Sequence, residues 1–166
     1  LTEGTVSLTV RDALRQMITI SHNYAALLLT EKIKLSSVAT FLKTNGLTES
    51  TVGTNGDAPK STPSDIALFY EKLYKGELAN QQYTEEMIDL LKSQQLDDGL
   101  PKYLPDKSKV AHKTGDIGWF KHDAGIVFTD KGDYIIVVMS ESESPSGAEE
   151  RISLVSKAIF DYFMLF

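Results

Sequence analysis

Three successive β-strand patterns between residues 109 and 140 constrain the fold more than any other feature of this sequence. Strands are predicted at about 109–115, 123–129 and 134–140, the last being the apolar run Tyr134–Met139, and Lys131-Gly132-Asp133 predicts a tight turn between the last two. Helical patterns fill the chain before these strands, and one more helical pattern follows them. This order predicts an α+β fold in which a small antiparallel sheet carries the terminal helix and leaves at least one sheet edge unpaired.

The helices are predicted from apolar residues that recur at helical spacing. The expected helices cover 10–19, 24–33, Ser36 or Ser37 to about Lys43, Pro63 to Gly76, a helix capped by Thr84, and Ala148 onward. Thr9 and Thr62 are expected caps, and Pro63 suits the first helical position. The terminal helix is expected to bury one face formed by Ile152, Val155, Ile159, Phe160 and Phe163.

Composition excludes several classes of protein. The 166 residues are 42% hydrophobic and carry a net charge of −6, which argues against a nucleic-acid binder. The chain has no cysteine, so disulfides and cysteine-ligated zinc are excluded. His22, His112 and His122 lie on different segments without ligand spacing, and we expect no metal and no cofactor. No run reaches the roughly 18 apolar residues of a membrane span. Because the sequence begins with Leu1, we expect a processed chain or a fragment.

Two short polar motifs are candidate sites. Lys113-Thr114-Gly115 ends the first predicted strand and offers an ammonium, a hydroxyl and a residue without a Cβ, which together suit an anion. Alone, such a motif is most often an ordinary strand end. Ser21-His22-Asn23 lies between the first two helices and alone is most often a cap or a turn. Trp119 and Phe120 either line a substrate cleft or plug the hairpin.

In this order, the two motifs resemble the serine β-lactamase and penicillin-binding-protein superfamily, most closely the class A-like β-lactamases. That family carries Ser-x-x-Lys, Ser-Asp-Asn and Lys-Thr-Gly. Val10–Leu14 and Ser61–Ala67 also resemble family segments. The resemblance implies one β-lactamase/transpeptidase-like domain over residues 1–166. Its helical part would cover about 1–107, and its sheet and terminal helix about 108–166.

The resemblance also implies a role for each matching residue. Ser21 would relay a proton to the leaving nitrogen, and Asn23 would bind the acyl-amide group of the substrate. Lys113 would attract the substrate carboxylate and Thr114 would hydrogen-bond it, while Gly115 leaves room at the backbone. The backbone N–H of Asp116 would be one oxyanion-hole donor. The implied ligand is a β-lactam or a D-Ala-D-Ala-like peptide, and the implied location is extracytoplasmic in a bacterium.

Three departures from the family pattern keep alternatives open. No Ser-x-x-Lys precedes Ser21, so the nucleophile and the first strands are expected on a missing N-terminal segment, possibly a separate chain. His22 replaces the family's aspartate. The loop 47–62 lacks Glu-x-x-Leu-Asn and has only Glu49 and Asp57 as acids. The hypotheses are therefore a β-lactamase, a DD-peptidase or low-turnover penicillin-binding protein, and a non-catalytic cell-wall binding module.

Overall fold

The structure, a computed structural model, describes residues 7–54 and 57–166. Its elements are α1 (Val10–Thr19), α2 (Asn23–Ile33), α3 (Leu35–Thr44), α4 (Pro63–Tyr74), α5 (Gln81–Lys92), the 3-10 turn η1 (Lys107–Lys109), β1 (Val110–Ile117), β2 (Phe120–Val127), β3 (Tyr134–Glu141) and α6 (Pro145–Phe163). The expected α+β layout is confirmed. The beginning of the predicted domain, residues 1–6, and residues 55–56 of the predicted loop lie outside the described residues.

Two helix starts are the predicted ones, because a threonine cap fixes each of them. Thr9 Oγ accepts the Asp12 backbone N–H at 3.1 Å, and Thr62 Oγ accepts the Asp65 backbone N–H at 3.2 Å. Pro63 follows Thr62 as the first residue of α4, where its missing N–H costs no helical bond. Both caps satisfy donors that the first turn of a helix leaves open.

Three other predicted starts are wrong. α5 begins after Asn80, whose side chain accepts the Tyr83 N–H at 2.9 Å, so Thr84 lies inside the helix and is buried. α3 begins directly after Lys34, which turns the chain at φ +67° and provides no side-chain cap. α6 begins at Pro145, three residues before Ala148, because proline suits the first helical turn.

The sheet has the order β1-β2-β3 and is antiparallel throughout. β2 begins at Phe120, earlier than predicted, because Gly118 and Trp119 alone connect it to β1. Gly118 has φ +57°, a conformation that glycine adopts without a steric cost. The two strands therefore stay paired to the tip of the hairpin, with Ile117 opposite Phe120.

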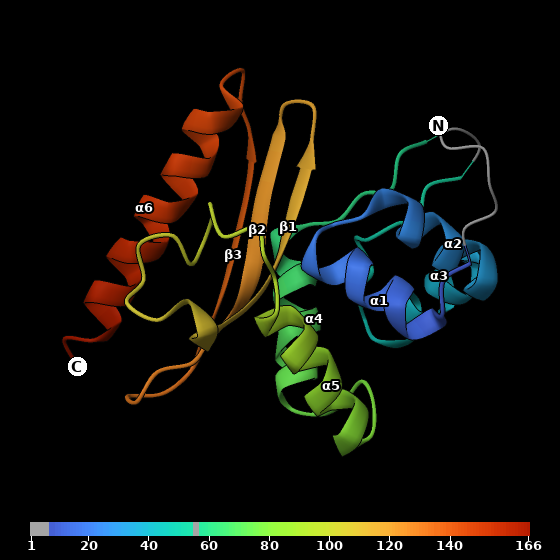
Figure 1. Cartoon of the computed structure of the whole chain (residues 1–166), viewed down its shortest axis with the longest axis horizontal. Coiled ribbons are helices and arrows are strands. Elements are labelled where there is room, and N and C mark those ends of the chain that lie inside the picture. Colours follow the sequence, from blue (N-terminus) through green and yellow to red (C-terminus); the bar gives the residue numbers. More distant parts are fainter. Residues whose placement is uncertain (1–6, 55–56) are drawn as a thin grey trace.

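Helices cover both faces of the sheet (Figure 1). α4 and α5 cover one face, here called the α4/α5 face, over a core of Tyr70, Leu73, Leu91, Ala111, Ala124 and Ile126. The other side is the α6 face, where the core is Leu100, Leu104, Val110, Val127, Ile136 and Ile152. α1, α2 and α3 form a separate cluster beside β1, with a small core of Ala13, Ala25 and Leu29. Because neighbouring strand residues alternate between faces, Lys113 shares its face with Ala111, and His112 shares its face with Val110.

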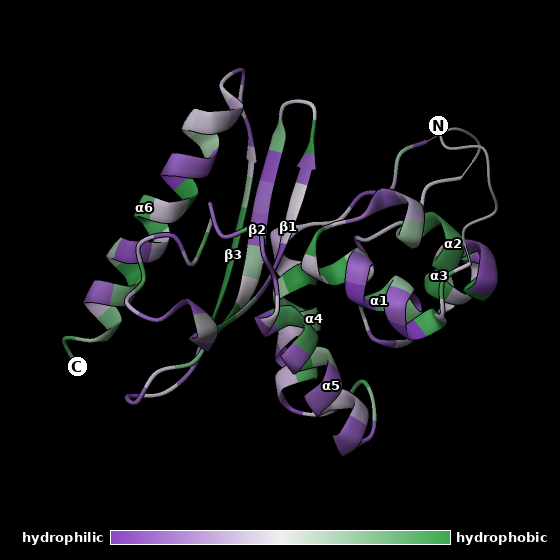
Figure 2. Ribbon diagram, viewed as in Figure 1, coloured by the Kyte–Doolittle hydropathy of each residue, from purple (hydrophilic) through white to green (hydrophobic). Residues whose placement is uncertain are grey.

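The outer side of the sheet at β3 and α6 remains apolar and open in the described part of the chain. β3 pairs only with β2, and Figure 2 shows it as a largely hydrophobic strand. The prediction of a single buried face on α6 is partly wrong: Ile152 is buried, whereas Val155 and Ile159 are 45% and 39% exposed. Ser153 and Ser156 are the buried polar residues of this helix. Within residues 7–54 and 57–166, none of the helices combines the length and the hydrophobicity of a membrane-spanning segment.

Candidate functional site

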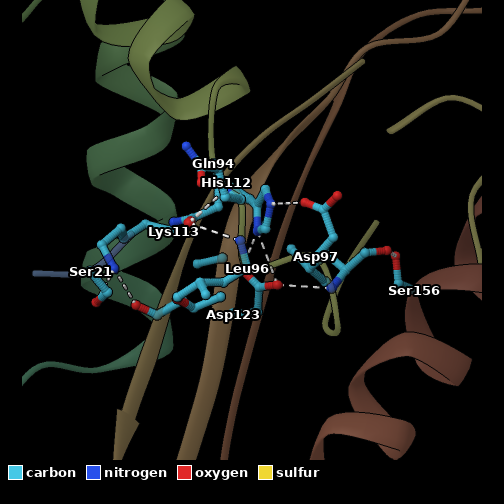
Figure 3. Close-up of polar contacts among 12 residues, drawn as sticks. Ser21, Gln94, Leu96, Asp97, His112, Lys113, Asp123 and Ser156 are labelled. Atoms are coloured by element: carbon cyan, nitrogen blue, oxygen red, sulfur yellow. Dashed lines mark hydrogen bonds and ion pairs between the residues drawn. The ribbon is translucent and has the colours of Figure 1, made fainter. Parts of the chain in front are cut away.

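The two sequence motifs meet at a lysine–serine contact. Lys113 Nζ on β1 donates to Ser21 Oγ at 2.7 Å, although the two residues lie 92 positions apart. The same ammonium donates to the Thr114 carbonyl oxygen at 2.8 Å. Among the described residues these are its two hydrogen-bond partners, so one N–H of the ammonium can still bind an incoming anion. Figure 3 shows Lys113 reaching from the strand toward Ser21.

Ser21 is held in a strained backbone conformation between α1 and α2. Its φ is +53°, which costs about 1–3 kcal/mol for a residue with a side chain and persists only where the surroundings enforce it. The next residue, His22, donates its backbone N–H to the Gln16 carbonyl at 3.1 Å. The bend thus ends α1, starts α2 and turns the serine hydroxyl toward β1.

His22 takes over the capping role at the start of α2. Its Nδ1 accepts the Ala25 backbone N–H at 3.2 Å, so the ring nitrogen satisfies a helix donor in the way a carboxylate would. Nδ1 can accept only when it carries no proton, which assigns the ring proton to Nε2. The histidine therefore supplies the side-chain acceptor that begins α2. Asn23 follows as the first residue of α2 and is exposed.

The backbone edge of β1 presents hydrogen-bonding groups to the same site. Phe128 N–H donates to the Lys109 carbonyl at 2.9 Å, which fixes the odd-numbered residues of β1 as those that exchange bonds with β2. The N–H and C=O groups of Thr114 and Asp116 therefore point away from β2, along the free edge of the strand. The bond from Lys113 Nζ to the Thr114 carbonyl confirms this direction.

The side chain of Asp116 is engaged elsewhere. Its carboxylate pairs with Lys121, the residue directly opposite on β2, and Lys121 also donates to Glu149 on α6 at 2.7 Å. Only the backbone of Asp116 is therefore available at the free edge. Gly115 is half-buried and lies opposite His122, whose side chain would touch an added Cβ at 3.4 Å.

Lys113 experiences two opposed electrostatic influences. Burial lowers the pKa of its ammonium, and the negative charge of Asp123 acts in the opposite direction. Asp123 belongs to β2 and lies opposite Thr114. A cation in this position attracts an anion more strongly than one in water, because the partly buried site screens charge poorly.

Behind Lys113 lies a buried pair that the sequence did not single out. His112 Nδ1 lies 2.9 and 3.1 Å from the two carboxylate oxygens of Asp123, and both residues are 1% exposed. The Leu100 backbone N–H donates to the same carboxylate at 2.8 Å. Figure 3 shows this pair between Lys113 and Ser156 of α6. The sequence did contain one signal of this pair. Strand alternation places His112 on the same face as the apolar Val110, and a histidine on such a face needs a buried polar partner.

Gln94 is a second residue that sequence reasoning missed. Its side-chain amide donates to the Ile18 carbonyl at 2.8 Å and accepts the backbone N–H groups of Gln95 and Leu96 at 3.0 and 3.2 Å. The Gln95 N–H also donates to the Thr19 carbonyl at 2.9 Å. These bonds tie the loop after α5 to the last turn of α1, directly before Ser21.

The predicted loop 47–62 is closed at its base by a polar clamp. Asp65 Oδ2 accepts the Glu49 backbone N–H at 3.0 Å and the Ser50 hydroxyl at 2.7 Å, and Ser50 contacts Ser61 at 2.7 Å. The Glu49 carboxylate accepts the Thr62 hydroxyl at 3.3 Å. The clamp therefore engages one of the two acids of this loop.

The hairpin tip and the histidines complete the set of predicted candidates. Trp119 is 59% exposed and Phe120 is also exposed, so neither forms a buried plug. In the part of the chain that the structure describes, no three His, Cys, Asp or Glu side chains gather where they could hold a metal ion. His122 Nδ1 instead accepts the Ser140 backbone N–H at 3.1 Å.

Comparison with known proteins gives a consistent set of similarities. The pattern of the Beta-lactamase enzyme family matches residues 2–163. A β-lactamase from Sphaerobacter thermophilus DSM 20745 is 24% identical, with a TM-score of 0.91 over 99% of this chain and 67% of its own. PBP-A is 23% identical with a TM-score of 0.91, covering 99% and 65%.

A leucine-to-glutamate variant of PBP-A, solved as an acyl-enzyme complex with penicillin G, is also 23% identical, with a TM-score of 0.90 over 99% of this chain and 65% of its own. The chain thus spans about two thirds of the length of these structures. No curated protein matches it.

Proposed function

The chain belongs to the beta-lactamase enzyme family, and from this premise we propose that it is the substrate-recognition part of a class A-like serine β-lactamase. The complete enzyme would form a serine acyl-enzyme with a β-lactam and hydrolyse it. One observation carries the proposal: the Lys113 ammonium donates to the Ser21 hydroxyl at 2.7 Å. This bond joins the two family motifs present in the chain into one polar site.

In the proposed reaction, the nucleophilic serine of the missing segment forms an ester as the C–N bond of the β-lactam breaks. Ser21 relays the proton released in this step: it takes up that proton and gives its own hydroxyl proton to the departing nitrogen. Its hydroxyl is suited to this because Lys113 holds the oxygen from one side and leaves the O–H free to turn toward the substrate. The Lys113 ammonium and the Thr114 hydroxyl bind the substrate carboxylate. A partly buried cation strengthens such a charge-assisted bond.

The remaining roles belong to the backbone and to Asn23. The outward N–H of Asp116 stabilises the oxyanion that forms as the acyl-enzyme is made, and Gly115 lets the substrate approach the strand. Asn23 binds the acyl-amide group of the substrate from the start of α2. No metal or other cofactor takes part in this mechanism.

We further propose that the nucleophile comes from a segment outside this chain, on the same polypeptide or a separate one. The apolar strand β3 has an open edge, and the exposed apolar residues of α6 lie next to it. A further strand and a helix would cover both surfaces and complete a single domain of which residues 1–166 form the larger part. The complete protein would act outside the bacterial cytoplasm, where β-lactams and peptidoglycan peptides are met.

A second candidate function is a DD-peptidase or a penicillin-binding protein with slow turnover. The observation that favours it is the polar clamp of loop 47–62, in which the Glu49 carboxylate is bonded to Thr62. An acid held there cannot activate the water that releases an acyl-enzyme. A non-catalytic cell-wall binding module is the third candidate, and it applies if the complete gene encodes no Ser-x-x-Lys.

The test uses the complete gene product, a chromogenic cephalosporin and intact-protein mass spectrometry. Rapid colour formation supports the hydrolase, and a persistent adduct supports the slow penicillin binder. Lys113→Ala should lower the acylation rate constant by about 100-fold, comparable to the loss of an oxyanion donor. Lys109→Ala, which removes an exposed ion pair with Asp130, is the matched control and should leave the rate unchanged. A complete protein with an intact Ser-x-x-Lys that shows neither colour nor adduct would refute the substrate assignment.

The 166-residue chain by itself should not hydrolyse β-lactams, because the described site contains a relay serine and a carboxylate-binding lysine but no Ser-x-x-Lys pair. The measurement is cephalosporin turnover by the isolated chain after gel filtration. Turnover that co-elutes with the chain and disappears in Ser21→Ala would show that the chain contains its own nucleophile.

A further inference from the structure

On the face of β1 opposite Lys113, His112 forms a buried pair with Asp123 of β2 that has no role in the mechanism above. We propose that His112 and Asp123 form a positioning pair that keeps Lys113 a cation at the free edge of β1 and so sets how strongly the site attracts a substrate carboxylate. The proposal rests on the proposed function for its substrate, but its physical basis is the geometry of the pair.

The pair is built into the register of β1 and β2. His112 lies opposite Gly125 and Asp123 lies opposite Thr114, so the two are diagonal neighbours on the α6 face. The imidazole Nδ1 reaches both carboxylate oxygens, and the Leu100 N–H reaches one of them. Ser156 Oγ on α6 then donates to the Leu100 carbonyl at 2.8 Å, which holds this loop residue in place.

Two glycines make room for the pair. A Cβ at Gly125 would lie 2.7 Å from His112 Cβ and 2.4 Å from the Ala111 carbonyl oxygen. A Cβ at Gly99 would lie 2.2 Å from Asp123 Oδ2. Larger residues at either position would push the imidazole or the loop away from the carboxylate. The close approach of both backbones is therefore a condition for burying the pair.

The electrostatic effect of the pair extends to Lys113. A buried carboxylate remains ionised only where donors compensate its lost hydration, and the imidazole and the Leu100 N–H are such donors. The resulting negative charge favours the protonated form of Lys113, opposing the effect of burial on its pKa. Removing the charge leaves burial unopposed, and Lys113 would then lose its proton at lower pH.

Other titratable groups surround the pair from every neighbouring element. Asp97, in the loop after α5, places Oδ1 3.8 Å from His112 Nε2. Tyr70 of α4 donates its hydroxyl to the Ala124 carbonyl, and both burial and Asp123 raise its pKa. On the α6 face, Asp98, Lys121 and Glu149 line the same shallow pocket as Asp123. Asp123 is the one of these acids that is almost fully buried.

The test measures the acylation of the complete protein by benzylpenicillin and by its methyl ester, as a function of pH. In Asp123→Asn, kcat/KM for benzylpenicillin should fall about tenfold at pH 8, the size of a lost charge interaction, while the ester loses little. The alkaline limb of the benzylpenicillin profile should move to lower pH. His112→Gln, which keeps a neutral donor, should cause a smaller shift in the same direction.

Ser153→Ala is the matched control, because it removes a buried serine hydroxyl of α6 that donates only within its own helix, to the Glu149 and Glu150 carbonyl oxygens. It should lower thermal stability and leave both the ester ratio and the alkaline limb unchanged. Equal losses for benzylpenicillin and its ester in Asp123→Asn would show a merely structural role and overturn the proposal. If Asp123→Asn fails to fold, the same comparison in His112→Gln decides.

A second readout separates this proposal from the proposed function. Direct NMR titration of the Lys113 side chain in the complete protein, assigned with Lys113→Arg, reports its protonation without any reaction. The titration should move to lower pH in Asp123→Asn and in His112→Gln. A protein that forms no β-lactam adduct but shows this movement refutes the substrate assignment and supports the pair. An unchanged Lys113 titration in both variants overturns the pair, whatever the acylation result.

Discussion

β1 carries a nitrogen-bearing side chain on each of its faces, Lys113 on one and His112 on the other, and the two differ in burial and in hydrogen bonding. Lys113, on the α4/α5 face, is half-buried and is bonded to one hydroxyl and one carbonyl oxygen. His112, on the α6 face, is 1% exposed and meets a carboxylate at each ring nitrogen. Lys113 keeps one N–H in reserve, whereas His112 is held at Nδ1 by the Asp123 carboxylate and lies beyond hydrogen-bond distance of Asp97 at Nε2. This difference fits the ligand-binding role proposed for Lys113 and the positioning role proposed for His112.

The largest effect should come from Gly125→Ala on β2, directly opposite His112 on the α6 face of the sheet. The added methyl group would lie 2.4 Å from the Ala111 carbonyl oxygen and 2.7 Å from His112 Cβ. Because both obstacles belong to β1, relief requires the strands to separate, and we expect a loss of about 3 kcal/mol of unfolding free energy. Urea unfolding followed by circular dichroism measures it.

Gly118→Ala is the control for that substitution. Gly118 has φ +57° in the hairpin turn, but an added Cβ meets no described atom within 4 Å. Its cost should be the conformational term alone, about 1 kcal/mol. If Gly125→Ala costs no more than Gly118→Ala, the two strands tolerate a wider spacing at His112 than the structure indicates.

A smaller effect is expected on the opposite side, where Gln94 supports Ser21. Gln94→Ala removes the bridge between the last turn of α1 and the loop after α5, and leaves the Ile18 carbonyl and the Leu96 N–H without this partner. We expect a loss of about 2 kcal/mol of stability. Since Ser21 follows that turn directly, the acylation rate of the complete protein should fall as well.

Gln82→Ala provides the comparison for Gln94. Gln82 is exposed on α5, and its side-chain amide donates to Glu86 on the same helix at 3.3 Å, so the substitution should be close to neutral in urea unfolding. An unchanged acylation rate in Gln94→Ala, at a temperature where the variant is folded, would show that the strained bend at Ser21 holds its own shape.

The contrast between Lys113 and His112 also explains which parts of the site could be predicted from the sequence. Lys113 and Ser21 lie in two short motifs that resemble those of one family, and this resemblance implied that they share a site although 92 positions separate them. The pair of His112 and Asp123 depends on register, which a one-residue error inverts. The second strand was expected to begin at 123, whereas it begins at Phe120 and places Asp123 well inside the paired region.

Helix caps also show how far local sequence can predict the structure. Thr9 and Thr62 were predicted because each stands directly before its helix, with an aspartate three residues later. The start of α5 was missed because Asn80 precedes a polar first turn, while Thr84 stands nearer to the apolar residues. Gln94 could not be predicted, since its partners lie on α1 and only the tertiary structure brings them together.

The smallest effect should come from His22, which supports the Ser21 side through one local bond. Its imidazole accepts the Ala25 N–H at 3.2 Å, at the positive end of the α2 dipole. His22→Asp offers a charged acceptor in the same place and should stabilise the protein by about 0.5–1 kcal/mol in urea unfolding. His22→Asn, a neutral acceptor of similar capping strength, separates geometry from charge: a gain equal to that of aspartate assigns the effect to the cap alone. A loss in both variants would mean that the imidazole ring makes a contribution beyond its Nδ1 bond, and that the Ser21 side of β1 is supported by packing as well as by local hydrogen bonds.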